Sequence, residues 1–248
     1  MKKIIWIDVG THFAQEHNSL FSSSLGFYYF VCKRFIGGMV LKRGRFVSFN
    51  QLKDIISSRA KIRKKSDAFF SIFVEANPKI VRKMSFYPCS DLSFNIALTE
   101  ESSSTVSIAK LFVGHGDELS EGNTLFEKKF EATDKTYIAT LGITSDSFFQ
   151  QVKEYLDEKF VHYKVLLRLN CEGVEDSVIY SARKNFGSKL KLILGSLKDV
   201  EELKGAEAAQ NLNDFIVSKN LNFVKFSSGI YSWPQAHIAI SELLENES

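Results

Sequence analysis

Short runs of apolar residues alternate with amphipathic segments along most of this chain. Several of the runs are nearly continuous in apolar character, which is typical of strands buried on both faces of a sheet. They predict strands at residues Lys3–Asp8, Phe69–Val74, Leu92–Leu98, Val106–Val113, Tyr137–Leu141, Tyr163–Leu169, Lys189–Leu194 and Asn222–Phe226. The segments between them place apolar residues at helical spacing. They predict helices at residues Gln51–Lys61, Ser145–Glu158, Val174–Lys184, Glu207–Lys219 and Gln235–Leu244.

Strands that alternate with helices predict an α/β fold, with a mostly parallel twisted sheet and helices on both faces. Proline is rare and no long linker or repeat divides the 248 residues, so we expect a single domain, residues 1–248. Two stretches depart from the alternation. One is an insertion at about 20–66, after the first strand. The other is a long charged loop at about 113–135, whose length is typical of a functional lid or of a surface excursion.

The charge of the chain is unevenly distributed. Apolar residues make up 44% of the sequence and charged residues 25%, which argues against a mostly disordered chain. The net charge is only +3, yet the stretch from Lys33 to Lys65 holds eleven Lys and Arg residues and one acid. This basic block therefore carries +10, and the rest of the chain is net negative.

Three interpretations of the basic block remain open. It can bind an anionic acceptor, such as a phosphorylated or nucleotide-linked sugar, through residues that include Arg43 and Arg45. It can contact nucleic acid, because basic and aromatic residues are interleaved there. It can also be a solvated helical face over residues 59–65 that keeps the protein soluble.

The three cysteines and five histidines show no metal-ligand spacing, so we expect no metal. Few cysteines, and an odd number of them, indicate a reducing compartment. Asp8 interrupts the apolar run at the N-terminus, and no window is apolar enough for a membrane span, so we expect a cytoplasmic protein. His115, inside the long loop, is a candidate for substrate contact.

Polar residues follow three of the predicted strands, where open α/β sheets bind ligands. Gly10 follows the first strand and would let a ligand approach the backbone closely. Glu75 follows the second strand, where an acid can accept both hydroxyls of a ribose, or can stabilise the start of a helix. Glu172 and Glu175 follow the strand at Tyr163–Leu169. Glu172 can act as a general base toward a hydroxyl, or can cap the next helix.

Four motifs in order carry a family resemblance. They read IDVGTHFAQE at 7–16, VEANP at 74–78, FNIALTE at 94–100, and GITSDSFFQQV at 142–152 followed by VLLRLNCEGVED at 165–176. In this set the chain resembles the FkbM family of S-adenosylmethionine-dependent methyltransferases over roughly residues 3–13 and 69–184. The resemblance implies a Rossmann-like class I methyltransferase fold and transfer of a methyl group to an oxygen, often a sugar hydroxyl.

The resemblance also implies roles for individual residues. It places the methionine part of the cofactor near Asp8, Gly10, Thr11 and His12. It places the ribose at Glu75, with Asn77 beside it, and the adenine near Asp91 and Asn95. Glu172 and Asn170 would be the catalytic residues, with Glu172 facing the transferred methyl group. Independently of the resemblance, Glu175, His115, Arg43 and Arg45 are the candidates for acceptor binding.

The chain departs from the family pattern at several positions. Ala14 replaces the second loop glycine, which a negative φ would tolerate, and Asn170 and Arg168 stand where the family has Asp and Lys. Asp8 and Glu75 are 67 positions apart (75 − 8), whereas a single helical crossover needs roughly 20–30. The extra residues contain the basic block, which we expect to emerge near the ligand crevice.

Taken together, the sequence predicts a methyltransferase that uses S-adenosylmethionine and a small-molecule acceptor, with a saccharide or sugar-derived hydroxyl as the acceptor. A catalytically degenerate binding protein on the same fold is one alternative, because of Ala14 and Asn170. A nucleic-acid methyltransferase is a second, which the absence of an (Asn/Asp)-Pro-Pro-(Tyr/Phe) motif disfavours. The oligomeric state does not follow from the sequence.

Overall fold

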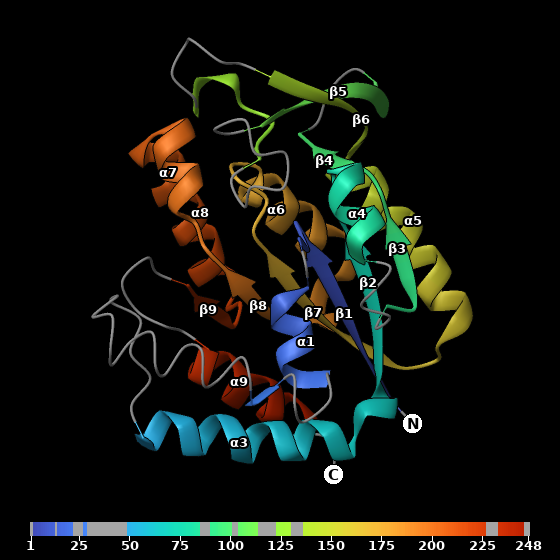
Figure 1. Ribbon diagram of the computed structural model, residues 1–248, viewed down its shortest axis with the longest axis vertical. Coiled ribbons are helices and arrows are strands. Elements are labelled where there is room, and N and C mark those ends of the chain that lie inside the picture. The colour runs from blue at the N-terminus through green and yellow to red at the C-terminus, as the bar shows by residue number, and fades with distance from the viewer. Residues whose placement is uncertain are drawn as a thin grey trace.

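A computed structural model of the protein describes residues 2–12, 14–21, 27–28, 49–84, 90–100, 104–113, 123–129, 136–226 and 233–245. The predicted α/β fold is confirmed: a parallel sheet lies between two layers of helices (Figure 1). Among the described residues, no helix has both the length and the apolar character that crossing a membrane requires.

The main sheet has six strands in the order β3-β2-β1-β7-β8-β9, and each neighbouring pair is parallel. The central strands are buried along almost their whole length, as their continuous apolar runs predicted. The strand bounds are β1 (Lys3–Val9), β2 (Phe69–Val74), β3 (Leu92–Phe94), β7 (Tyr163–Leu169), β8 (Leu190–Gly195) and β9 (Phe223–Lys225).

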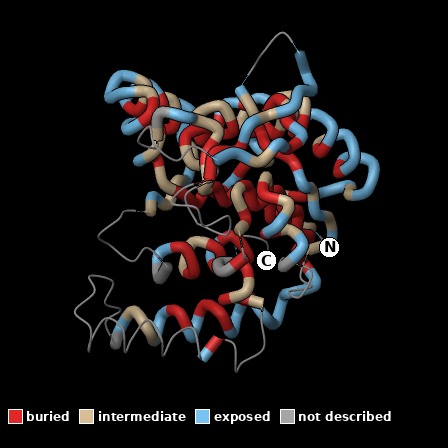
Figure 2. The backbone as a smooth tube through the Cα atoms, turned by 45° about the horizontal axis from the view of Figure 1, so that its top comes forward, coloured by how far each residue is buried: buried red, intermediate tan, exposed pale blue. Residues whose placement is uncertain are grey.

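Alternate residues of the strands enter two separate cores, one on each face of the sheet. Ile4 and Trp6 of β1 face one core, while Ile5 and Ile7 face the other. The first core is covered by α1 (Gln15–Phe21), α3 (Phe49–Lys64), α4 (Pro78–Met84) and α9 (Trp233–Glu245). The second is covered by α5 (Ser145–Lys159), α6 (Glu175–Phe186), α7 (Lys198–Lys204) and α8 (Ala206–Ser218). Figure 2 shows the resulting alternation of buried and exposed residues along α3.

A second, three-stranded sheet has the order β4-β6-β5, with β4 at Ala97–Thr99, β5 at Val106–Val113 and β6 at Thr136–Thr144. The prediction of one strand over Leu92–Leu98 is therefore wrong, because β3 and β4 belong to different sheets. Asn95 lies between them, and its side-chain amide donates hydrogen bonds to the carbonyls of Glu75 and Ala76. This turn takes the chain away from the main sheet after three paired residues.

The small sheet lies at the carboxyl edge of the main one (Figure 1). The Thr140 hydroxyl of β6 donates a hydrogen bond of 2.9 Å to the Ala76 carbonyl, just after β2. Val106 and Ile108 of β5 are exposed, so this strand is not buried on both faces as its apolar run suggested.

The described part of the basic block is the helix α3, which packs against α9 (Figure 1). Its C-terminal end reaches the amino edge of the main sheet, because Lys3 at the start of β1 donates to the carbonyl of Asp67. Arg59 is buried, with its guanidinium over the Phe27 ring, so residues 59–65 are not a uniformly solvated face. Lys61 forms an ion pair with Glu245 of α9. This part of the block is therefore remote from the carboxyl edge, contrary to the expectation from the sequence.

Candidate functional site

The strand order brings the predicted site residues to one edge of the sheet. From β1 the sheet extends through β2 and β3 on one side and through β7, β8 and β9 on the other. Open α/β sheets bind ligands at such a switch in direction, at the carboxyl ends of the strands. Gly10, Glu75 and Asn170 directly follow β1, β2 and β7, so they lie at this edge, with Glu172 two residues further on.

The loop after β1 is held tightly between its neighbours. Gly10 has a φ of +70°, and a Cβ on it would lie 2.1 Å from the carbonyl oxygen of Asn170. The backbone N–H groups of Gly10 and Thr11 both donate to the Val74 carbonyl, at 2.9 and 3.2 Å. The Thr11 hydroxyl donates to the Asp8 carbonyl at 2.7 Å. The close approach of the backbone at Gly10 therefore serves the protein's own β7 loop.

Ala14 adopts a left-handed conformation with a φ of +49°. The negative φ under which alanine would replace glycine without strain is therefore not adopted. A left-handed conformation costs an L-residue about 1–2 kcal/mol, whereas glycine adopts it without a steric cost. His12, two residues earlier, also has a positive φ of +50°. This loop therefore stores backbone strain next to the candidate site.

Asp8 forms a buried ion pair with Arg168, a residue to which the sequence assigned no role. The two residues are paired in the register of β1 and β7, and their side chains are at most 5% exposed. The Arg168 guanidinium donates to the Asp8 carboxylate at 3.0 Å and to the Gly10 carbonyl at 2.7 Å. Arg168 thus joins the Asp8 side chain to the loop that follows β1. The sequence would have revealed this pair only if the parallel register of β1 and β7 were known, because that register places Asp8 opposite Arg168.

Glu75 uses both carboxylate oxygens to join two loops. One oxygen accepts the backbone N–H of His12 and the other accepts that of Asn77, both at 2.8 Å. Burial raises the pKa of Glu75, and these two backbone hydrogen bonds oppose the rise. A carboxylate has about four acceptor positions, so it keeps capacity for two further hydroxyl donors. A ribose needs two such positions, one for each of its two hydroxyls, so the number of acceptor positions left on Glu75 fits a ribose.

Two of the three remaining cofactor candidates lie beside Glu75. Asn95 donates its amide to the Glu75 carbonyl at 2.9 Å, and Asn77 accepts the Lys79 N–H at the start of α4. Asp91 lies elsewhere. It precedes β3, and its carboxylate accepts the N–H of Ser71 at 2.7 Å, in the first half of β2. The structure therefore does not bring Asp91 to the carboxyl edge.

The turn after β7 is organised by Glu175, the first residue of α6. Its carboxylate is fully buried and accepts the backbone N–H groups of Cys171 at 3.0 Å and Gly173 at 2.8 Å. The proposed contact of Glu175 with an acceptor is therefore not what the structure shows; the side chain holds the turn instead. Burial and the neighbouring carboxylates raise the pKa of the Cys171 thiol, which is unsuited to act as a thiolate nucleophile.

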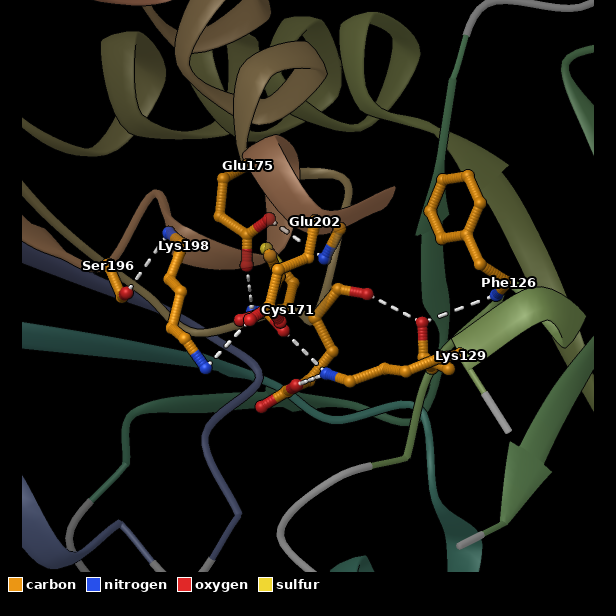
Figure 3. Close-up of polar contacts among 11 residues, drawn as sticks. Phe126, Lys129, Cys171, Glu175, Ser196, Lys198 and Glu202 are labelled. Carbon is orange, nitrogen blue, oxygen red and sulfur yellow. Dashed lines mark hydrogen bonds and ion pairs between the residues drawn. The ribbon is translucent and has the colours of Figure 1, made fainter. Parts of the chain in front are cut away.

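Glu172 is presented by this turn and is paired with Lys129, which the sequence analysis did not single out. Lys129 ends the 3₁₀ turn Glu127–Lys129, in the predicted long loop. Its ammonium group contacts the Glu172 carboxylate and lies 2.5 Å from the Asp199 carboxylate at the start of α7 (Figure 3). The sequence distance between these groups explains why no local motif reveals the cluster.

The segment 123–129 packs over the β7 turn at two further points. The Thr124 hydroxyl donates a hydrogen bond of 2.5 Å to the Glu172 carbonyl. Phe126 lies against Gly173, where a Cβ would come within 2.8 Å of the ring. Glu172 itself has a φ of +56°. The part of the loop that the structure describes is therefore a cover over the candidate base.

The two charges of the ion pair are perturbed by burial and by each other. Burial raises the pKa of Glu172 to about 7, against the opposing effect of Lys129, and Asp199 and Glu175 add to the rise. Burial by itself would lower the pKa of Lys129, but its hydrogen bonds to Asp199 and Glu172 raise that pKa overall. A carboxylate poised near neutral pH is suited to general base chemistry.

Three predicted acceptor contacts, Arg43, Arg45 and His115, lie outside the described residues. Within the described ranges, no group of three His, Cys, Asp or Glu side chains is arranged to hold a metal ion. Comparison with protein families, with curated proteins and with solved structures found no match to this chain.

Proposed function

We propose that this protein is an S-adenosylmethionine-dependent O-methyltransferase that acts on a saccharide or sugar-derived hydroxyl. The observation that supports this most is that Glu75 and the Glu172 turn both follow strands that end at the carboxyl edge, on either side of β1, where the strand order changes direction. Three of the motifs agree with this placement, since IDVGTHFAQE, VEANP and VLLRLNCEGVED each extend past the carboxyl end of a strand of the main sheet, namely β1, β2 and β7.

In this proposal Glu75 holds the ribose through its remaining acceptor positions, and the loop at Gly10–His12 lies against the methionine part. When bound, S-adenosylmethionine supplies an electrophilic methyl group on a positively charged sulfur. Glu172 accepts the proton of the acceptor hydroxyl, and Asn170 lies at the end of β7 to orient that hydroxyl.

The charge around Glu172 bears on the class of acceptor. Among the described residues, the carboxylates of Glu172 and Asp199 share the single ammonium of Lys129. Glu175 adds a third carboxylate, whose oxygens already accept two backbone N–H groups. A net negative surrounding repels phosphate groups, so the described charges favour a neutral hydroxyl over a phosphorylated acceptor.

The first experiment is titration calorimetry with S-adenosylhomocysteine. We expect the wild type to bind, and Glu75→Gln to bind at least about tenfold more weakly, because hydrogen bonds to a charged group are worth about 1.5–3 kcal/mol. Asp91→Asn is the matched control and should bind like the wild type, because Asp91 lies away from the edge. Circular dichroism checks that each variant is folded. No binding by the wild type, or equal binding by Glu75→Gln, would contradict the proposal.

The second experiment measures S-adenosylhomocysteine release with panels of neutral sugars, sugar phosphates and nucleotide sugars. Turnover of a neutral sugar that is lost in Glu172→Gln supports the proposed reaction.

A degenerate binding protein is the second candidate function. The ion pair of Lys129 with Glu172 and the strained Ala14 favour it. Cofactor binding without turnover of any panel would support it. We do not propose a nucleic-acid methyltransferase, because the described basic helix lies at the other edge of the sheet.

A further inference from the structure

Lys129 occupies an unusual position for a lysine on a charged loop. Its side chain is 21% exposed, and its ammonium group lies between the carboxylates of Glu172 and Asp199, which are 14% and 13% exposed. An ammonium group has three N–H donors, so one remains after the two carboxylates are paired. The three groups come from three separate segments, which the fold brings together (Figure 3).

We infer that Lys129 is a positioning residue that orients Glu172 and sets its charge, and that Asp199 limits its effect by sharing the same ammonium group. The inference rests on the proposed function, in which Glu172 takes the proton of the acceptor. Without Lys129, the buried or half-buried carboxylates of Glu172, Glu175 and Asp199 would lose the ammonium group that, among the described residues, contacts both Glu172 and Asp199. Like charges at this range oppose ionisation.

The geometry fixes the carboxylate as well as its charge. Thr124 holds the backbone carbonyl of Glu172, while Lys129 holds one oxygen of its side chain, and both belong to the segment 123–129. In the proposed function, the other carboxylate oxygen of Glu172 would accept the proton of the acceptor. The third N–H of Lys129 then adds a donor for the oxygen of the same hydroxyl. A donor and an acceptor side by side suit a neutral alcohol.

Two other lysines of this neighbourhood, among the described residues, are paired with acids of their own. Lys198 of α7 lies 2.8 Å from Glu202 on the same helix. Lys204 lies 2.5 Å from Asp176 of α6 and also contacts Glu100. The described groups that act on Glu172 are therefore Lys129 from the covering segment, Asp199 from α7 and Glu175 from α6.

The test measures the charge of Glu172 directly. Carbon-13 NMR of the full chain, with labelled glutamate carboxyl groups, follows the titration of Glu172, whose signal is assigned by its loss in Glu172→Gln. We expect Lys129→Met to raise the apparent pKa of Glu172 by about one unit or more, because an opposite charge in contact is removed. Lys129→Arg keeps the charge and should keep the midpoint close to that of the wild type.

Asp199→Asn gives the discriminating result. It removes a neighbouring negative charge and leaves Lys129 to Glu172 alone, so the apparent pKa of Glu172 should fall. Lys198→Met is the matched control: it removes a lysine of the same neighbourhood that does not contact Glu172, and should cause little shift. Amide spectra of each variant must retain the signals of 123–129, which shows that the cover remains folded.

An unmoved midpoint in Lys129→Met would overturn the inference. So would an upward shift in Asp199→Asn, or a shift in Lys129→Arg as large as in Lys129→Met. The titration needs no cofactor, so it is independent of the proposed function. Failure of the wild type to bind S-adenosylhomocysteine would end the proposed function and leave the ion-pair result standing. Normal binding with an unmoved midpoint would end only the role of Lys129.

Discussion

His17 of α1 is a neutral histidine enclosed by the core, and acidification should destabilise the fold through it. Its ring lies 5.3 Å from Trp6, 4.4 Å from Phe21 and 5.0 Å from Phe73, measured between ring centroids. Its Nε2 lies 2.8 Å from the Ser71 hydroxyl. Burial lowers the pKa of His17 to about 3, because the described aromatic rings and hydroxyl around it solvate a charge on the ring poorly.

The sign and size of the effect follow from linkage. The unfolded chain binds a proton on His17 as the pH falls through about 6.5, whereas the folded protein does not until about pH 3. Stability from this group is therefore complete above pH 6.5 and is lost as the pH falls. Each pH unit is worth about 1.4 kcal/mol, so the loss at pH 5 is about 2 kcal/mol.

The measurement compares His17→Gln with the wild type by urea unfolding at pH 7.5 and pH 5. A comparison of variants is needed because burial raises the pKa of Glu75 and Glu175, which act in the opposite direction on acidification. We expect the free-energy cost of His17→Gln to be about 2 kcal/mol smaller at pH 5 than at pH 7.5. Phe73→Leu, in the same core, should cost the same at both values. An equal cost of His17→Gln at the two pH values would refute the reasoning.

Three further predictions concern the loops of the site. Gly10→Ala should destabilise the fold by about 2 kcal/mol or more, since its Cβ would overlap the Asn170 carbonyl at a positive φ, and urea unfolding measures this loss. Arg168→Met should cost about 3–5 kcal/mol because it leaves Asp8 buried without this partner, and adding Asp8→Asn should recover part of that cost in thermal unfolding. Asn77→Ala should cost about 1 kcal/mol by removing the side-chain cap of α4, whereas Asn77→Asp should cost much less in the same assay.

The sequence alone determined most strands of the main sheet and several of the helices that cover it. The predicted helix at Ser145–Glu158 differs by one residue from α5, and the runs at Phe69–Val74 and Tyr163–Leu169 match β2 and β7. A strand that is buried on both faces needs a continuous apolar run, and a helix that is buried on one face needs apolar residues at helical spacing. Both patterns lie within a single segment of sequence, so each can be recognised without knowing the fold. The polar residues at the ends of these strands could be predicted as well, because each directly follows an apolar run.

Contacts between distant segments were decided by the tertiary structure. The sequence showed that Arg168 departs from the family motif, but only the register of β1 and β7 shows that it is the partner of Asp8. Asp91 is only four positions before Asn95 in the sequence, yet it precedes its strand and lies beside Ser71 of β2, away from the carboxyl edge. The position of Asp91 depends on where the three-residue strand β3 begins and in which direction it runs. So short a strand has too little periodicity for the sequence to predict this.

The segment 123–129, which covers Glu172, is the clearest case of a contact that the sequence could not predict. Lys129 lies 43 residues before Glu172 and 70 before Asp199, in a stretch that the sequence predicted only as a long loop. The carboxylate itself was predicted, because it follows a buried strand. Its partner was not, because an ion pair depends on the distance between two charges in space, and the packing of three separate segments sets that distance.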